Sequence, residues 1–144
     1  MLYQYLYELL MITIEQLLIK HEALRLLPYK DSTGHLTIGV GRNLTDVGLS
    51  KDECMMLLHN DINRTVNALQ AHLAWYNQQP TAVRSVLTDM CFNMGIDGLL
   101  EFHTTLGYIQ AYRYKDASVS MLQSLWARQV GSRATEDSKM LASA

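Results

Sequence analysis

Hydrophobic residues near the start of the chain recur at helical spacing. The intervals of three and four residues predict a helix that ends near Glu22 or Ala23. The residues that carry these intervals are Leu10, Ile14, Leu17, Leu18 and His21. Pro28 prevents the helix from continuing, because proline has no backbone N–H to donate and clashes with the preceding turn.

The pattern changes to strand-like alternation between Leu26 and Leu44. His35–Val40 alternates in the way that is typical of a half-buried strand. Lys30–Gly34 has the composition of a hairpin turn. We therefore predict a small antiparallel sheet of two or three strands in this segment.

Helical spacing returns at Ser50 and dominates the rest of the chain. Ser50 and Glu53 match the S-x-x-E capping box, which predicts the start of a helix that extends to about Ala74. Thr81 is expected to cap the next helix, which should end at Gly95. Two or three shorter helices are predicted around Phe102–Tyr112, Asp116–Ala127 and Ser132–Leu141.

These elements indicate an α+β fold that is mainly helical. A small β-bearing N-terminal lobe, at about residues 12–60, is expected to be joined by the long helix at about residues 51–74 to a helical C-terminal lobe at 75–144. A chain of 144 residues fits one domain with two lobes. Residues 1–11 are a possible N-terminal extension, because Met11 could be an alternative start.

Composition favours an ordered protein that does not bind nucleic acid. Hydrophobic residues make up 49% of the chain and charged residues 18%, which is enough apolar material for a core and argues against disorder. The net charge of −2 lacks the basic excess that is typical of nucleic-acid-binding proteins. We expect a monomer.

The cysteines and histidines predict neither a metal site nor a bound cofactor. Cys54 and Cys91 lie in apolar helical patterns, so we expect two reduced core thiols. A disulfide between them is the less favoured alternative, and a metal site at Cys54 and His59 is less favoured still, because two ligands do not complete a site.

The first 21 residues are apolar enough to raise the question of a membrane segment. Glu8 and Glu15 interrupt the run, so no stretch approaches the ~20 apolar residues that a membrane span needs. No positively charged start or cleavage site of an export signal is seen. An amphipathic helix is the preferred interpretation, and a membrane-tethering segment is the alternative.

The candidate chemistry lies between His21 and Leu44, in the run HEALRLLPYKDSTGHLTIGVGRNL. Glu22 stands at the end of a predicted helix, Asp31 in a predicted turn and Thr37 in a predicted strand. Glycosidases typically cleave a glycosidic bond with two carboxyl groups that stand on separate elements and face one cleft. Partial burial at the helix end would favour the protonated form of Glu22, which a general acid needs.

This run resembles the catalytic stretch of the phage-type (T4-like) lysozymes, which hydrolyse the peptidoglycan of bacterial cell walls. The matched positions are His21, Glu22, Leu24, Arg25, Leu26, Tyr29, Asp31, Gly34, Thr37, Ile38, Gly39 and Gly41. The resemblance continues through residues 89–95 and 126–134, and it covers roughly residues 12–136. Ala23 departs from the family, which usually has glycine there.

The resemblance implies a muramidase that cleaves the β-1,4 bond between N-acetylmuramic acid and N-acetylglucosamine. Glu22 is then the general acid, and Asp31 and Thr37 together hold the attacking water. A base acting through a water inverts the anomeric carbon, so we expect the two carboxyl groups to be ~6.5–9.5 Å apart. The implied partner is the peptidoglycan glycan strand.

The resemblance also implies supporting roles for other residues. Arg133 falls where the family has an arginine that reaches the catalytic glutamate. Phe92, Asn93 and Thr105 match positions that face the substrate cleft, whereas Trp126 is expected to pack in the core. Arg42 replaces a family histidine that pairs with an aspartate at the position of Asp61, so we predict an Arg42–Asp61 ion pair.

The family and the missing export signal together suggest a phage or prophage endolysin that stays in the host cytoplasm until it is released to the wall. One alternative is another lysozyme-like glycosidase, such as a lytic transglycosylase, although transglycosylases do not need a water-holding aspartate. A second alternative is an inactive wall-binding or structural protein that retains the fold.

Overall fold

The computed structural model describes residues 2–3 and 13–144 of the chain. The possible extension over residues 1–11 and the first turn of the predicted N-terminal helix lie largely outside the described residues. Two compact units make up the chain, Met1–Cys54 and Met55–Ala144. The organisation as one domain stays a prediction.

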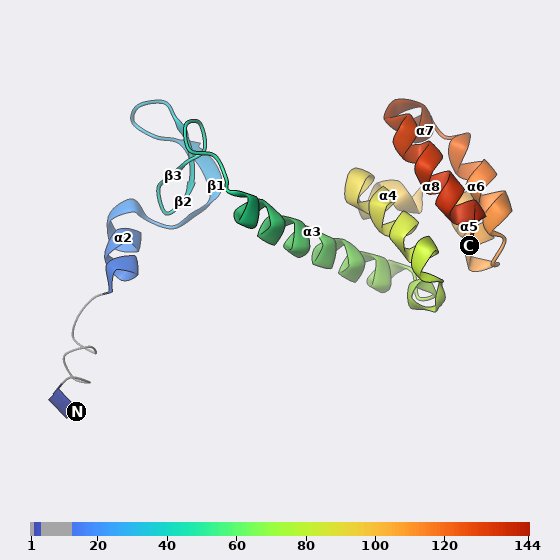
Figure 1. Cartoon of the computed structure of the whole chain (residues 1–144), viewed down its shortest axis with the longest axis horizontal. Helices are drawn as coiled ribbons and strands as arrows, with labels where there is room; N and C mark the ends of the chain where they lie inside the picture. Colours follow the sequence, from blue (N-terminus) through green and yellow to red (C-terminus); the bar gives the residue numbers. More distant parts are fainter. Residues whose placement is uncertain (1, 4–12) are drawn as a thin grey trace. The chain divides into compact units, whose positions relative to one another are not determined.

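The first unit contains a helix followed by a three-stranded antiparallel sheet in the order β1-β2-β3 (Figure 1). Its elements are α2 (Ile14–Glu22), β1 (Arg25–Lys30), β2 (Leu36–Gly39) and β3 (Arg42–Asn43). A capping box at Thr13 begins α2, since the Thr13 hydroxyl accepts from the Gln16 backbone N–H and the Gln16 side chain accepts from the Thr13 N–H. The predicted helix end at Glu22 and the predicted sheet are both confirmed.

Backbone and side-chain hydrogen bonds, rather than an apolar core, order the first unit. In its described part Thr37 is the one buried side chain, with 4% of its surface exposed. The β1–β2 turn is closed by the Gly34 N–H, which donates to the Asp31 carbonyl. The unit ends with the capping box predicted at the start of α3, where Ser50 N–H donates to Glu53 Oε2 at 2.7 Å and Glu53 N–H donates to Ser50 Oγ at 3.2 Å.

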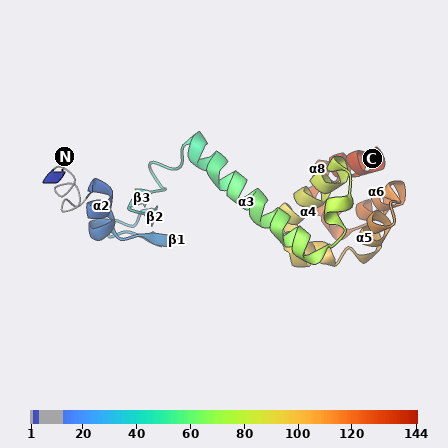
Figure 2. The same cartoon turned by 90° about the horizontal axis from the view of Figure 1, so that it is seen from below.

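All the regular elements of the second unit are helices. It contains the rest of α3 (Lys51–His72), the short 3-10 helix η1 (Tyr76–Gln78), α4 (Thr81–Leu100), α5 (His103–Gln110), α6 (Tyr114–Leu122), α7 (Leu125–Val130) and α8 (Ser132–Ala142). In Figures 1 and 2 the helices from α4 to α8 gather into one bundle, in which α8 packs against α4, α6 and α7. The mainly helical α+β fold class is therefore confirmed.

Three details of the second unit differ from the sequence-based expectations. Pro80, and not Thr81, is the N-cap of α4. Gly95 does not end α4, because its backbone at φ 78° and ψ 165° makes a kink after which the helix resumes. The helix expected over residues 116–127 is two helices, because the Ser124 hydroxyl accepts from the Ala127 N–H and starts α7 as a separate element.

The core of the second unit is formed by apolar side chains from every one of its helices. The fully buried members are Leu69, Val83, Val86, Leu87, Met90, Leu99, Ile109, Ala117, Met121, Ala134 and Leu141. Trp126 is also in this core, as predicted, at 8% exposure. No helix in the described part of the chain is both long and apolar enough to cross a membrane.

The two cysteines occupy different environments. Cys91 is a buried thiol in the core, as expected, and burial raises its pKa. The expectation of a core position is wrong for Cys54, which is exposed in the first turns of α3, where the flanking residues are mostly exposed as well. Both thiols are free.

Candidate active site

Glu22 is the last residue of α2, directly before the turn into β1. The segment between β2 and β3 approaches its carboxylate so closely that a Cβ on Gly41 would lie 3.0 Å from Glu22 Oε2. Gly41 also has φ +71°, a conformation that side chains disfavour. The positive φ favours glycine at this position, where the backbone passes close to the Glu22 carboxylate. Within its own unit the Glu22 side chain is exposed.

Ala23, which follows Glu22, has a strained backbone. It caps α2 at φ 61° and ψ 155°, in a region that is populated almost only by glycine. The departure from the family's glycine therefore carries a physical cost at the residue next to the proposed acid.

Replacing Ala23 by glycine is expected to stabilise the protein. Removing the Cβ relieves strain of about 1–3 kcal/mol, while the more flexible unfolded chain offsets about 0.5–1 kcal/mol. Thermal unfolding should show a melting temperature higher by roughly 2–4 °C. Ala111→Gly is the matched control, because Ala111 caps α5 at an ordinary φ of −86° and should lose stability instead. A lower melting temperature for Ala23→Gly would contradict the strain.

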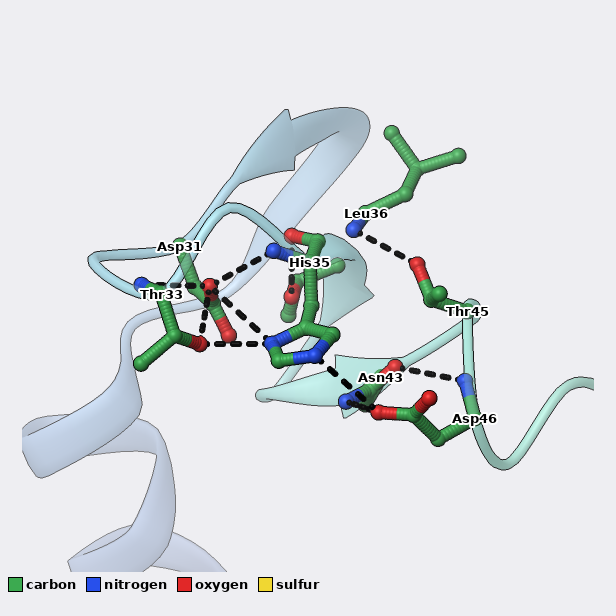
Figure 3. A network of polar contacts seen from close by, with 8 residues as sticks. Asp31, Thr33, His35, Leu36, Asn43, Thr45 and Asp46 are labelled. Atoms are coloured by element: carbon green, nitrogen blue, oxygen red, sulfur yellow. Dashed lines mark hydrogen bonds and ion pairs between the residues drawn. The ribbon is translucent and has the colours of Figure 1, made fainter.

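Asp31 lies in the β1–β2 turn, where one of its oxygens holds the turn together (Figure 3). Its Oδ1 accepts from the Thr33 N–H at 2.9 Å, the Thr33 hydroxyl at 2.8 Å and the His35 N–H at 2.9 Å. These donors, the Thr33 hydroxyl first, lower the pKa of the Asp31 carboxyl from its ordinary value. Asp31 is therefore a carboxylate at neutral pH. Its other oxygen, Oδ2, takes no part in the hydrogen bonds that hold the turn.

Thr37 is brought close to this turn by the sheet. It lies in β2 opposite Tyr29 of β1, and the neighbouring pair is Lys30 with Leu36. Its side chain is buried, and its hydroxyl donates to the His35 carbonyl at 3.2 Å, a long bond. Its role in holding a water stays a prediction.

His35 and Asp46 extend the polar network beyond the residues that the sequence singled out (Figure 3). The His35 ring lies with Nδ1 2.6 Å from the Thr33 hydroxyl and with Nε2 3.3 Å from Asp46 Oδ2. Asn43 fixes Asp46 by donating from its amide to Asp46 Oδ2 and by accepting from the Asp46 N–H, each at 2.9 Å. The composition of the turn is the only sequence signal for Thr33, and none marks His35 beyond its place in a strand pattern.

Arg42 has a partner in its own unit that the sequence did not indicate. Arg42 binds Glu53 with two nitrogens, each at 2.7 Å from a carboxylate oxygen, and this contact lowers the pKa of Glu53 to about 2. Asp61 instead pairs with Arg64, one helical turn away on α3. A pair of Arg42 with Asp61 stays a prediction, because the two residues belong to different units.

Arg133, in the second unit, is held by Asp89. Its Nε and Nη2 donate to the two carboxylate oxygens at 2.7 and 2.8 Å, a bidentate contact between α8 and α4. A contact of Arg133 with Glu22 stays a prediction, because the two residues belong to different units.

Asp137 completes a carboxyl pair with Asp89 that the sequence did not reveal. It is 6% exposed, and its Oδ2 has no donor among the described residues. Burial first, and the adjacent Asp89 carboxylate second, raise the pKa of Asp137 to about 7, whereas the Arg133 guanidinium lowers that of Asp89. The pair therefore shares one proton near neutral pH, and this proton lies mainly on Asp137.

The three predicted saccharide contacts do not line one pocket of the second unit. Phe92 is 43% exposed and lines an apolar groove of about 540 Å³ that also includes Ile62 and Arg133. Thr105 is buried and donates to Ser120 Oγ at 3.0 Å, in a different pocket.

Asn93, the third of these residues, has a structural partner. It is exposed, but its side-chain oxygen accepts from the Trp126 indole N–H at 2.8 Å. This contact satisfies the one polar atom of the core Trp126. The substrate roles of Phe92, Asn93 and Thr105 stay predictions.

No group of three or more His, Cys, Asp or Glu side chains within residues 2–3 and 13–144 is placed to hold a metal ion.

Comparison with known proteins identifies the family of the chain. The phage lysozyme family model matches residues 19–141, which include Glu22, Asp31, Thr37 and Arg133. The chain is also similar to a probable T4-type lysozyme 2 from Dictyostelium discoideum, with 22% identity over a match that covers 84% of this chain and 88% of that protein. Since the family match spans most of the sequence, the chain belongs to the phage lysozyme family, whose members act on peptidoglycan.

Proposed function

We propose that this protein is a muramidase that hydrolyses the β-1,4 bond between N-acetylmuramic acid and N-acetylglucosamine with inversion. The observation that carries the proposal is the different environment of two carboxyl groups in one small unit. Asp31 is kept ionised by three donors on one oxygen, whereas Glu22 accepts no hydrogen bond within the described part of its unit. Carboxyl groups in contrasting environments are suited to opposite proton-transfer roles.

The proposed reaction uses these two groups in one step. Glu22 donates its proton to the glycosidic oxygen as the bond from that oxygen to the anomeric carbon breaks. A water held by Asp31 and Thr37 attacks the opposite face of the anomeric carbon and gives a proton to Asp31. The protein ends the step with Glu22 ionised and Asp31 protonated, and exchange with solvent restores both.

The geometry of the turn supports the role of Asp31 as the base. Oδ1 is saturated by the backbone and side chain of the turn, so its position is fixed and Oδ2 is the oxygen available to a water. A fixed base is valuable, because an error of about 1 Å in a reacting group can lower the rate by about 10²-fold.

Mass spectrometry of fragments released from purified peptidoglycan tests this function. We expect fragments that end in N-acetylmuramic acid and carry the mass of one added water. Fragments that end in an anhydro sugar would identify a lytic transglycosylase, and fragments that end in N-acetylglucosamine would identify a different glycosidase. Binding to peptidoglycan without any release of fragments would identify a wall-binding protein.

A further inference from the structure

The Thr33 hydroxyl stands between the proposed base and a histidine. Its oxygen is 2.8 Å from Asp31 Oδ1 and 2.6 Å from His35 Nδ1 (Figure 3). A hydroxyl has one proton to donate and can accept through its oxygen. Thr33 can therefore donate to Asp31 or to His35, but not to both.

The proton on His35 decides between these two arrangements. When both ring nitrogens carry protons, Nδ1–H donates to the Thr33 oxygen, Nε2–H faces Asp46, and the Thr33 hydroxyl is left to donate to Asp31. When the ring is neutral, Asp46 retains the Nε2–H, because a carboxylate can only accept. Nδ1 is then an acceptor, and its short contact draws the Thr33 proton away from Asp31.

We propose that Thr33 and His35 form a proton-controlled switch that sets the strength of Asp31 as a base. With His35 protonated, the Thr33 hydroxyl stabilises the Asp31 carboxylate and makes it a weaker base. With His35 neutral, Asp31 loses this donor and becomes a stronger base towards its water. The inference rests on the proposed function of Asp31, and it adds Thr33 and His35 as positioning residues.

The surroundings of His35 suit a group that changes its charge. Among the described residues, the charged groups that face its ring are Asp31 from the β1–β2 turn, 3.7 Å from Nδ1, and Asp46 from the segment after β3, 3.3 Å from Nε2. The His35 side chain is 38% exposed, so solvent can exchange its proton. Histidine is the side chain that ordinarily changes charge between pH 5 and 8.

The Thr33 hydroxyl is also the strongest influence on Asp31. It is the first cause of the lowered pKa of the Asp31 carboxyl, ahead of the two backbone donors and of the His35 charge. Turning the hydroxyl away therefore removes the largest single stabilisation of the carboxylate. The direct charge of His35 acts in the same direction but is weaker.

Titration of the Asp31 carboxyl carbon by NMR in the full chain tests the switch directly. The wild type should show one step at acid pH, when Asp31 itself ionises, and a second step at the pH where the His35 ring titrates in the same sample. In Thr33→Val the acid step should move up by about one pH unit, and the second step should lose most of its size. In His35→Phe the acid step should stay low and the second step should disappear.

Ser32→Ala is the matched control, because Ser32 is an exposed hydroxyl residue in the same turn whose side chain makes no hydrogen bond with the described residues. It should titrate as the wild type does. A second step of unchanged size in Thr33→Val would show that only the charge of His35 reaches Asp31, which would overturn the switch. An acid step that does not move in Thr33→Val would overturn it as well.

The switch and the proposed function fail in different ways. If Asp31→Asn abolishes hydrolysis while the wild-type carboxyl shows no second step, Asp31 is needed for the reaction and the switch is wrong. If the two titration steps behave as expected but Asp31→Asn still hydrolyses peptidoglycan, the switch stands and the role of Asp31 as the base is wrong. If both hold, the acid limb of kcat/KM in Thr33→Val should shift by the same pH interval as its NMR step.

Discussion

Glu22→Gln is expected to lower kcat/KM for peptidoglycan hydrolysis by about 10²- to 10⁴-fold, the range that general acid catalysis contributes. Glutamine keeps the size of the side chain and its place beside Gly41, but its amide cannot give a proton to the leaving oxygen. The initial rate at which a peptidoglycan suspension clears measures the loss.

The stability of Glu22→Gln should be close to that of the wild type, because the side chain is exposed and surface substitutions usually change the free energy of unfolding by less than about 0.5 kcal/mol. Glu15→Gln is the matched control, since Glu15 is an exposed glutamate in the first turn of the same helix. Clearing by Glu22→Gln at the rate of the control would show that Glu22 is not the acid.

Asp137→Asn is expected to stabilise the protein at pH 8 by a few kcal/mol. The folded protein holds the Asp137 proton up to about pH 7, whereas the unfolded chain releases it near the ordinary value of 3.8. The unfolded chain therefore binds fewer protons across this window, and the free energy of unfolding falls as pH rises from about 4 to about 7. Asparagine keeps the donor to Asp89 at every pH and so avoids this loss.

Chemical denaturation at pH 4.5, 6 and 8 measures the effect. The wild type should lose stability across the series relative to Asp137→Asn, and the difference between the two should be largest at pH 8. Each pH unit of difference in proton affinity corresponds to about 1.4 kcal/mol, although the coupling to Asp89 keeps the total at the level of a few kcal/mol. Asp97→Asn is the control, because Asp97 is an exposed carboxyl residue of α4 that is not among the groups that shift the pKa of Asp137, and it should follow the wild type. A pH dependence in Asp137→Asn equal to that of the wild type would contradict the shared proton.

The sequence predicted those parts of the fold that depend on local signals. The end of α2 at Glu22, the hairpin at Asp31 and the capping box of Ser50 with Glu53 are each specified by a few adjacent residues. A local signal was misleading at Gly95, where we predicted the end of a helix. The Gly95 backbone does leave the helical conformation, but the helix resumes after it.

Contacts between distant residues could not be predicted in the same way. Arg133 and Asp89 are 44 residues apart, and nothing in the pattern of either helix indicates that they meet. Asp137 looks like a solvated helix residue in the sequence, yet the packing of α8 on α4 buries it. We assigned Asp61 as the partner of Arg42 by analogy with the family. In the structure the Arg42 guanidinium donates to Glu53, a contact that the sequence pattern did not indicate.

The roles of Glu22, Asp31 and Thr37 came from the family resemblance and not from composition. Alone, a glutamate at a helix end and an aspartate in a turn have ordinary structural explanations. The structure adds the physical difference between them, since three donors of its turn hold one Asp31 oxygen, whereas Glu22 accepts no hydrogen bond within the described part of its unit. It also shows that the Ala23 backbone is strained, so this departure from the family motif has a measurable consequence.

The anomeric configuration of the first product tests the central claim most directly. Proton NMR can follow the newly formed reducing end of a soluble glycan fragment in the first minutes, before the anomers equilibrate. Water delivered by Asp31 from the face opposite to Glu22 predicts that the α anomer appears first. An initial β anomer would require a covalent or retaining mechanism, and it would contradict the assignment of Asp31 as a base that acts through water.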